Sequence, residues 1–525
     1  METQKKTLGQ PFRLHSFDEQ EIQPRTVTVL LLAFFLIGIL LRLVNLGEFP
    51  LYSDEDNHTH VAIQLLNGVP VDYFRGFFPV SLPVFLSFKL FGISIFAARL
   101  PMILLNMLAI FPLYKLTARL NQLIGLLAVF LFITNPWVIT AARTAREYSV
   151  LPLLFFVTSN LLIDLLDVEN LSPRAYFAEK KAKVFFALAI LVYVIFIDPR
   201  SWFTLALLSY LIFFGLIFLD LARRPQYRTR LIIAAVVLAS VFIGIVFQTL
   251  RSQKMTDFSK SPFSLVPKFE SLQTIIADPF ANSYWLPQIG YLILAFVLLL
   301  LVVSLPTFSE KKSRVILFNV IAFIGVTVFF VFIFFNAYVQ FRFRYGILLV
   351  YFIIPCVAIF IYSVSRLIKP KNTALSTMIP LTLLTAVFFV NIPSIQAIYN
   401  YQGKGRHPVS GNAHYRYGSA YEYLASKILP GEALLSNSFY YVDEMNGNRL
   451  QNPQRIEFNT VFREERKSIK QAVNAYKTGW VAVYPDTLLE KLGFENGDFV
   501  VGDKSFEYHG RIDDVYLWHW KTINY

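Results

Sequence analysis

Eleven long apolar runs constrain this chain of 525 residues more than any other feature. A helix needs about 20 mostly apolar residues to cross a bilayer. Measured against that length, the candidate spans are 26–44, 97–114, 122–139, 148–166, 184–198, 201–220, 231–249, 288–305, 315–335, 345–365 and 374–393. The runs predict a mainly α fold, a polytopic transmembrane helix bundle.

Composition supports a membrane protein and argues against other classes. The chain is 55% hydrophobic and 16% charged, whereas soluble proteins carry about 25% charged residues. The net charge of +13 would suit nucleic acid, but the basic residues cluster in short loops between apolar runs, so we expect no nucleic-acid partner. The only cysteine, Cys356, excludes an internal disulfide.

Several apolar segments need separate interpretation. The runs 184–198 and 201–220 are joined only by Asp198-Pro199-Arg200, which predicts a tight hairpin. The stretch Val80 to Phe91 is short and contains Pro83 and Lys89, so we expect an interfacial or re-entrant helix. The first apolar run lies behind a polar segment and lacks a small-residue cleavage site, so we expect no cleavable signal peptide.

Loop charges predict the orientation. One set of loops holds sixteen basic residues: Lys115, Arg119, Arg174, Lys180, Lys181, Lys183, Arg223, Arg224, Arg228, Arg230, Lys311, Lys312, Arg314, Arg366, Lys369 and Lys371. The opposite short loops hold five: Arg143, Arg146, Arg200, Arg342 and Arg344. The positive-inside rule makes the first set cytoplasmic. We expect a plasma (inner) membrane protein with a cytoplasmic N-terminal tail (1–25), a transmembrane module (26–393) with outer loops 45–96 and 250–287, and an extracytoplasmic tail.

The tail 394–525 is polar and mixed in pattern. It predicts helices at Ser419 to Ile428 and Ser468 to Lys477, strands at Ala433 to Asn437 and Trp480 to Tyr484, and alternating strand material from Phe499 to Trp520. We expect a C-terminal extracytoplasmic α/β domain, because about 130 residues suffice for one.

Three consecutive carboxylates, Asp54, Glu55 and Asp56, follow the first span. Charges are costly inside hydrocarbon, so they should lie at or beyond the membrane surface. A carboxylate there could take a proton from an acceptor hydroxyl. The alternative is a solvated acidic turn in which Ser53 or Asp54 caps a helix from Asn57 to Leu66.

The same segment offers weak candidates for a divalent metal, namely Asp54, Glu55, Asp56 and His58. His58 and His60 are two residues apart, a spacing that points them away from each other on a helix. The sequence thus indicates no definite cofactor and leaves a divalent metal as an open alternative.

The outer basic residues are candidates for an anionic ligand. Arg143 and Arg146 lie before one span, and Arg342, Arg344 and Tyr345 lie at the start of another. Arginine suits phosphate because its planar fork gives paired hydrogen bonds and stays charged. The alternative is contact with lipid headgroups. On the same side, Tyr148, Asp198 and Arg200 are candidates to line a substrate cavity.

Several short motifs occur in a fixed order along the chain. They are Asp54-Glu55 with Ala62, Leu65, Leu66 and Gly68; Lys89-Leu-Phe-Gly92; Ala98-Arg-Leu-Pro101; Tyr114 to Arg119; Asn135-Pro136 with Ala142-Arg-Thr-Ala-Arg-Glu-Tyr148; and Arg344-Tyr345 with Pro355. This series resembles the GT-C glycosyltransferases, in the branch of protein O-mannosyltransferases and lipid A aminoarabinose transferases. Phe77-Phe-Pro-Val-Ser-Leu-Pro83 stands where that branch often has His-Pro-Pro.

The resemblance implies a membrane glycosyltransferase with a polyprenyl-phosphate sugar donor, a lipid, glycan or protein acceptor, and an active site on the outer face. Asp54 matches the family's catalytic acid position, and Glu55 matches its neighbour, which supports geometry or a metal. Two other classes stay open: a transporter or flippase for a lipid-linked sugar, and a non-catalytic membrane subunit whose outer domain binds partners.

Overall fold

The computed structural model describes residues 22–48, 51, 53–71, 76–119, 121–166, 181–183, 185, 350–351, 354–355, 357–359, 361–362, 373–401, 405–407, 413–414, 416, 418–429, 432–436, 454–457, 473, 476–483 and 497–523. Apart from Phe185, the predicted spans between 184 and 335 and the loop 250–287 lie outside these residues. The chain divides into two compact units. The first unit comprises residues 1–42, 103–142 and 147–396, and the second comprises residues 43–102, 143–146 and 397–525.

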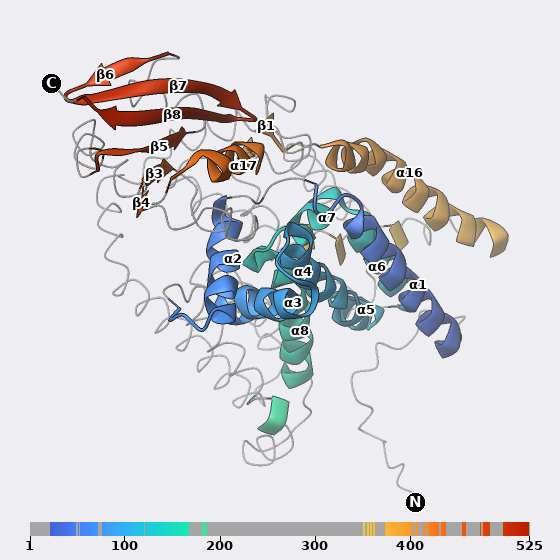
Figure 1. Cartoon of the computed structure of the whole chain (residues 1–525). Helices are drawn as coiled ribbons and strands as arrows, with labels where there is room; N and C mark the ends of the chain where they lie inside the picture. The colour runs from blue at the N-terminus through green and yellow to red at the C-terminus, as the bar shows by residue number, and fades with distance from the viewer. Residues whose placement is uncertain are drawn as a thin grey trace, which may run out of the picture. The chain divides into compact units, whose positions relative to one another are not determined.

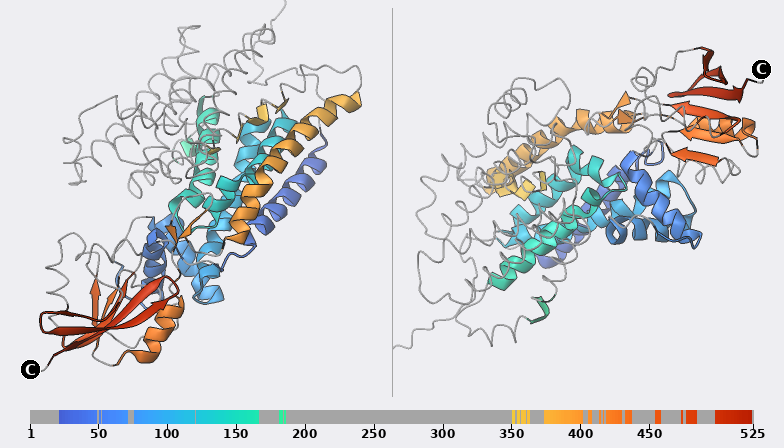
Figure 2. Two further views of the ribbon diagram at one scale, coloured as in Figure 1. Left: turned by 90° about the horizontal axis from the view of Figure 1, so that it is seen from above. Right: turned by 90° about the vertical axis from the view of Figure 1, so that its left-hand side faces the viewer.

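Apolar helices dominate the first unit. They are α1 (Pro24–Leu43), the end of α4 (Ile95–Leu108), α5 (Ile110–Ala118), α6 (Gln122–Thr134), α7 (Pro136–Ala142), α8 (Glu147–Leu166) and most of α16 (Thr373–Asn400). The Phe130 ring of α6 lies 6.0 Å from Phe34 of α1 and 6.1 Å from Phe388 of α16. These ring contacts place α1, α6 and α16 side by side (Figures 1 and 2).

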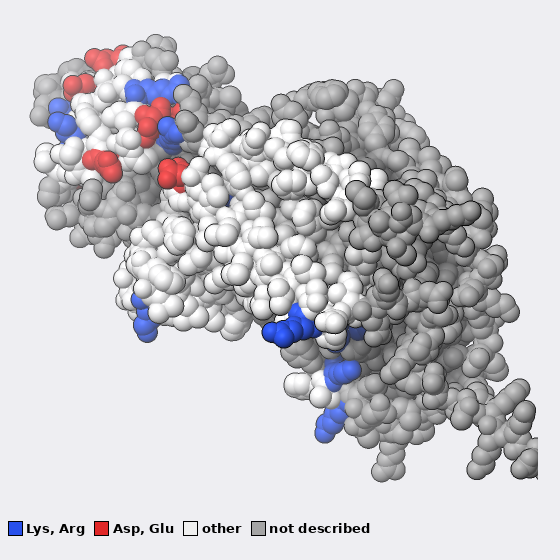
Figure 3. All heavy atoms as spheres, turned by 90° about the vertical axis from the view of Figure 1, so that its right-hand side faces the viewer, with Lys and Arg blue, Asp and Glu red and all other residues white. Residues whose placement is uncertain are grey.

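The described helices suit a bilayer. Among them, Pro24–Leu43, Ile95–Ala118 and Leu381–Asn400 are long and apolar enough to cross it, and the pair α6 and α7 would make a fourth span. A stripe of leucines on α1 is exposed, with Leu36 at 61% and Leu40 at 64%. Such a stripe faces lipid in a membrane protein, and on the face drawn in Figure 3 much of the described surface carries no charge. The chain is a membrane protein.

The described helices follow the predicted spans with three differences. The predicted span 97–114 comprises α4 and α5, which together run from Ile95 to Ala118. Helix α16 continues to Asn400, so the predicted end of the transmembrane module at residue 393 falls inside a helix. The predicted span 122–139 is not straight, because α6 and α7 are bent by 63°. The described positions between 350 and 362 are helical, within the predicted span 345–365.

Asn135 and Pro136 cause the bend, and Arg42 stabilises it. Pro136 has no N–H to bond the Phe132 carbonyl, and Asn135 Oδ1 accepts the Trp137 and Val138 N–H groups at 2.9 and 3.2 Å as the N-cap of α7. The end of α6 thus has carbonyls without helical partners. The buried Arg42 donates from Nη1 to Ile133 O at 3.2 Å and from Nη2 to Phe132 O at 3.5 Å.

Three short helices begin the second unit. They are α2 (Ser53–Leu66), the π-helix η1 (Phe77–Ser81) and α3 (Leu82–Phe91). The expected short helix at Val80 to Phe91 is confirmed and begins at Phe77. Gly68 ends α2 with φ of 66°, and the Val69 N–H reaches Gln64 O at 2.9 Å. The Leu65-Leu66-x-Gly68 motif is therefore a helix C-cap, where glycine avoids the left-handed penalty.

A mixed sheet forms most of the rest of the second unit. Strands β3 (Ala433–Ser436), β4 (Gln454–Glu457), β5 (Thr478–Val483), β6 (Phe499–Val501), β7 (Lys504–Ile512) and β8 (Val515–Thr522) have the order β4-β3-β5-β8-β7-β6. Strands β4, β3 and β5 are parallel, and β5, β8, β7 and β6 are antiparallel. Helix α17 (Gly418–Lys427) contacts β7, and β1 (Gly405–Arg406) pairs with β2 (Ala413–His414).

The core of this sheet explains why its strands were visible in the sequence. Val481, Val483, Phe506, Trp518 and Trp520 are buried in one cluster, and alternation of such residues is the strand signal. The expected strands near 433, 480 and 499–520 and the helix near 419 are confirmed. Most of the expected helix 468–477 lies outside the described residues, and the separate extracytoplasmic domain stays a prediction.

Candidate functional site

The acidic segment lies in the first turn of a helix. Helix α2 begins at Ser53, four positions before the expected start at Asn57, so Asp54, Glu55 and Asp56 are helical rather than part of a loop. Carboxylates are favoured here because the first turn of a helix carries partial positive charge. For Asp54 and Asp56 the structure describes the backbone alone.

Glu55 is buried and fully engaged. Its Oε1 accepts the Arg99 Nε–H at 3.1 Å and the Ala145 N–H at 2.7 Å, and its Oε2 accepts Arg99 Nη2 at 2.9 Å. Both side chains of the ion pair are 0% exposed. A carboxylate held on both oxygens in this way fixes geometry and is poorly placed to take a proton or bind a metal.

Two arginines hold the turn between α1 and α2, residues 44–48. Arg99 Nη1 donates to Leu46 O at 3.1 Å. Arg143 donates from Nη1 to Val44 O and from Nη2 to Asn45 O, the latter at 3.2 Å. Asn45 has φ of 53°, a conformation that asparagine adopts more readily than most residues. The turn that presents α2 is thus fixed from two sides.

The 44–48 turn also reaches the end of α16. Asn45 Nδ2 donates to Tyr399 O at 3.2 Å, and the Arg143 guanidinium carbon lies 5.6 Å from the centre of the Tyr399 ring. Burial lowers the pKa of Arg143 to about 10, and the charge of Arg99 acts in the same direction. Arg143 therefore stays cationic at neutral pH.

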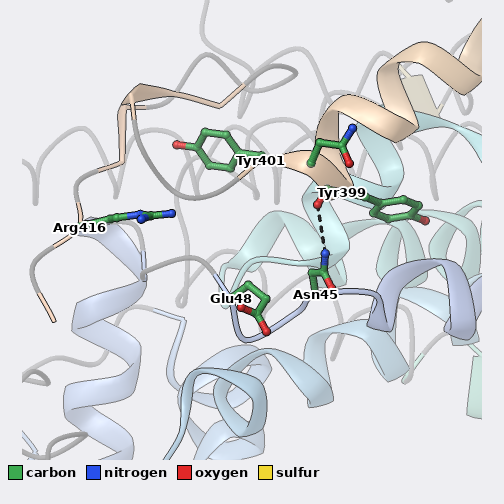
Figure 4. Close-up of a pocket in the computed structure, with 6 residues that line it drawn as sticks. Asn45, Glu48, Tyr399, Tyr401 and Arg416 are labelled. Atoms are coloured by element: carbon green, nitrogen blue, oxygen red, sulfur yellow. Dashed lines mark hydrogen bonds between the residues drawn. The ribbon is translucent and has the colours of Figure 1, made fainter. Parts of the chain in front are cut away.

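A polar pocket of about 620 Å³ lies beside this turn. It is lined by Asn45, Glu48, Tyr399, Asn400, Tyr401 and Arg416 (Figure 4). Arg416 is anchored through its backbone, since its N–H donates to Asp514 Oδ2 at 2.8 Å and its carbonyl accepts the Asp514 N–H at 3.0 Å. The lining residues thus carry a carboxylate, a guanidinium, amides and phenols, which are groups that can bind a polar ligand.

The structure places some of the other expected site residues. Arg143 is 1% exposed, Arg146 3% and Tyr148 6%. Tyr148 O accepts the Tyr351 hydroxyl at 3.0 Å, and the buried His58 has Nδ1 3.1 Å from Ser81 Oγ. Five expected residues lie outside the described part of the chain: Asp198, Arg200, Arg342, Arg344 and Tyr345.

Sequence reasoning missed the partners rather than the acids. Arg99 stands in the Ala98-Arg-Leu-Pro101 motif, but nothing in its local pattern assigns it to Glu55, 44 residues away. Asn45, Glu48, Tyr399 and Arg416 carried no signal as a group, because they meet only in the folded chain.

Comparisons with known proteins bear on the fold. No protein-family model matches the sequence, and no curated protein matches it. The crystal structure of ArnT from Cupriavidus metallidurans bound to undecaprenyl phosphate matches with a TM-score of 0.50 at 12% identity, over 94% of this chain and 98% of that one. The apo state of that protein matches with a TM-score of 0.44 at 13% identity, over 94% and 98% of the two chains.

The oligosaccharyltransferase of Archaeoglobus fulgidus in complex with Zn and sulfate matches with a TM-score of 0.48 at 12% identity, over 94% of this chain and 73% of that one. The likeness to the undecaprenyl-phosphate-bound ArnT shows that the chain shares the fold of that protein, the GT-C fold.

Proposed function

We propose that this chain, which has a GT-C fold, transfers a sugar from a polyprenyl-phosphate donor to a lipid, glycan or protein acceptor on the outer face of the membrane. The observation that carries the proposal is the buried Glu55–Arg99 pair, which fixes the first turn of α2 immediately after α1. A catalytic base is effective only where its position is held. Asp54 occupies that turn and is the proposed base.

Glu55 has a positioning role in this scheme. Its two oxygens bond Arg99 and the Ala145 N–H, so it ties α2 to α4 and to the 143–146 segment. Asp54 would accept the proton of the acceptor hydroxyl while the glycosidic bond to phosphate breaks. The bond to the acceptor oxygen forms, and the polyprenyl phosphate leaves with the electron pair.

The donor phosphate is proposed to lie among cationic residues on the same side. Arg146, Arg342 and Arg344, with Tyr345, are the proposed phosphate ligands. Arg143 already donates to Val44 and Asn45, so a phosphate would share it with the turn that it holds. Tyr148, Asp198 and Arg200 are proposed to line the substrate cavity. Should a divalent metal take part, Asp54 and Asp56 would be its ligands, since Glu55 is engaged.

The polar pocket beside the turn is a proposed site for the sugar or the acceptor. Sugars are bound by side chains that donate and accept hydrogen bonds, and Glu48, Asn45 and Arg416 provide both roles. The proposed orientation places the N-terminus in the cytoplasm, with residues 45–96 and 394–525 outside, as the loop charges predict.

Release of polyprenyl phosphate tests the proposal. Membranes that contain the chain would be supplied with undecaprenyl phosphates carrying different sugars, with empty membranes as the control. The proposal predicts release of undecaprenyl phosphate from at least one donor and sugar transfer to membrane material. Movement of intact donor across the bilayer without release would instead support a flippase. If the donor neither releases undecaprenyl phosphate nor crosses the bilayer, the result would support a non-catalytic subunit.

A further inference from the structure

Three side chains of types that can bind a metal lie close together on the sheet. Glu507 and His509 belong to β7 and His519 to β8, and each offers one ligand atom, all within 4.8 Å of one another. Glu507 lies directly opposite His519 in the antiparallel register, and the register shifts between Tyr508 and Gly510. This irregularity places His509 at a bulge, which redirects a side chain.

Each histidine has one ring nitrogen held by a neighbour. His519 Nε2 lies 2.8 Å from Glu432 Oε1 and 3.2 Å from Thr478 Oγ1. His509 Nδ1 lies 3.1 Å from the Tyr423 hydroxyl. A histidine that binds a metal through one nitrogen almost always has its other nitrogen held by a carboxylate or another polar group. These contacts leave Nδ1 of His519 and Nε2 of His509 for a ligand.

His509 Nε2 is the informative atom. It is buried and has no hydrogen-bond partner among the described residues, and its nearest acid, Glu507 Oε1, is 3.9 Å away. Buried polar atoms are normally satisfied, so an exception asks for an explanation such as an absent ion. A cation between His509, His519 and Glu507 would satisfy this nitrogen.

Trp480 holds both rings in place. Its ring centre lies 4.7 Å from that of His509 and 4.7 Å from that of His519, and its indole N–H donates to Glu432 Oε2 at 3.2 Å. Trp480 thus packs on the two ligands and bonds the carboxylate that orients one of them. The cluster is preorganised by packing.

We propose that Glu507, His509 and His519 bind a zinc ion. Two imidazoles and a carboxylate are a ligand set that zinc favours, with water or one further group in the fourth position. The ion would link β7 to β8 across the bulge and so stabilise the end of the sheet. Lys521 Nζ lies 4.0 Å from Glu507 Oε2, but both side chains are mostly exposed, so this weak pair is easily displaced. The proposal uses none of the residues proposed for sugar transfer.

The test is zinc binding by the full chain in detergent after removal of metals with a chelator. The expected result is one zinc per chain by elemental analysis and, with Co²⁺ as the probe, the intense visible absorption of a tetrahedral site. His509→Ala and His519→Ala should each abolish both signals. Glu432→Gln should weaken zinc affinity by about 10–100-fold, the usual effect of losing such an orienting partner.

The controls separate metal binding from folding. Glu422→Gln, outside the cluster, should keep zinc. Zinc should raise the melting temperature of the unchanged chain, whereas the melting temperature of His509→Ala should be the same in zinc and in chelator. Absence of zinc binding by the unchanged chain, or full binding by the His509→Ala/His519→Ala double variant, would overturn the proposal.

Discussion

Arg99 donates two hydrogen bonds to the carboxylate of Glu55, at 3.1 and 2.9 Å, and neither side chain is exposed to solvent. This ion pair joins α4 to the first turn of α2. A buried pair of this kind is weak evidence for stability, yet breaking it leaves an uncompensated charge. Its value in this fold is positional, because it holds the turn that carries Asp54.

Removing the Arg99 side chain should therefore lower the stability of the fold. Arg99→Ala leaves Glu55 buried without its cation, and we expect a loss of about 3–5 kcal/mol of stability. Arg99→Lys should recover part of this, because lysine keeps the charge and loses the planar fork. Thermal unfolding in detergent measures both, with the exposed Lys89→Ala on α3 as the control. An Arg99→Ala chain as stable as Lys89→Ala would contradict a buried ion pair.

Arg42 should matter for a different reason. It donates to the Phe132 and Ile133 carbonyls where Pro136 interrupts the helix, and unsatisfied backbone groups cost several kcal/mol each within a bilayer. We expect Arg42→Ala to lower the unfolding temperature strongly. The companion change Pro136→Ala, which restores the missing N–H, should soften this loss. Equal effects of Arg42→Ala with and without Pro136→Ala would refute the link between the two positions.

The loop charges predict a topology that reporter fusions can measure. Fusions after Arg230 and Arg314 should report a cytoplasmic position, because those loops hold clustered basic residues. Fusions after Lys268 and within 400–525 should report the outer side. A cytoplasmic C-terminus would place α2 and its acids on the wrong face for an outer active site.

If the proposed phosphate ligands are correct, substitutions on the two sides of the membrane should differ in their effect on donor affinity. Arg146→Ala and Arg344→Ala should each weaken binding of a lipid-phosphate sugar by about 1.5–3 kcal/mol, the worth of a hydrogen bond to a charged group. Arg→Lys at either position should rescue only partly. Arg223→Ala and Lys311→Ala, on the predicted cytoplasmic side, should leave donor affinity unchanged. The same loss from both sides would indicate general destabilisation.

Much of the fold was predictable because its signals are local. An apolar run long enough to cross a bilayer identifies α1, and alternation around Val481 and Trp518 identifies strands. The 63° bend between α6 and α7 was not predicted, although Pro136 is evident in the sequence. The bend is also stabilised by Arg42, which is distant in sequence. Local pattern finds an element, but it does not reveal which distant side chain completes it.

The same distinction between local signals and distant partners applies to the candidate site. The sequence marks Asp54 and Glu55 as candidates by type and position, but the burial of Glu55 depends on Arg99 and on the Ala145 N–H, 90 residues away. The start of α2 at Ser53 was also missed, because three adjacent acids resemble a solvated turn. The proposed zinc ligands Glu507, His509 and His519 were not predicted from the sequence. A bulge brings His509 close to the other two, and sequence spacing does not reveal a bulge.

The most direct measurement compares Asp54→Asn with its neighbour Asp56→Asn. Both changes are nearly isosteric and remove one charge from the same turn, so they should perturb folding alike. If Asp54 is the base, turnover in the polyprenyl-phosphate release assay should fall by about 10²–10⁴ in Asp54→Asn, the usual worth of a positioned acid–base group. Asp56→Asn should keep most activity at equal expression. Full turnover in Asp54→Asn would contradict the account.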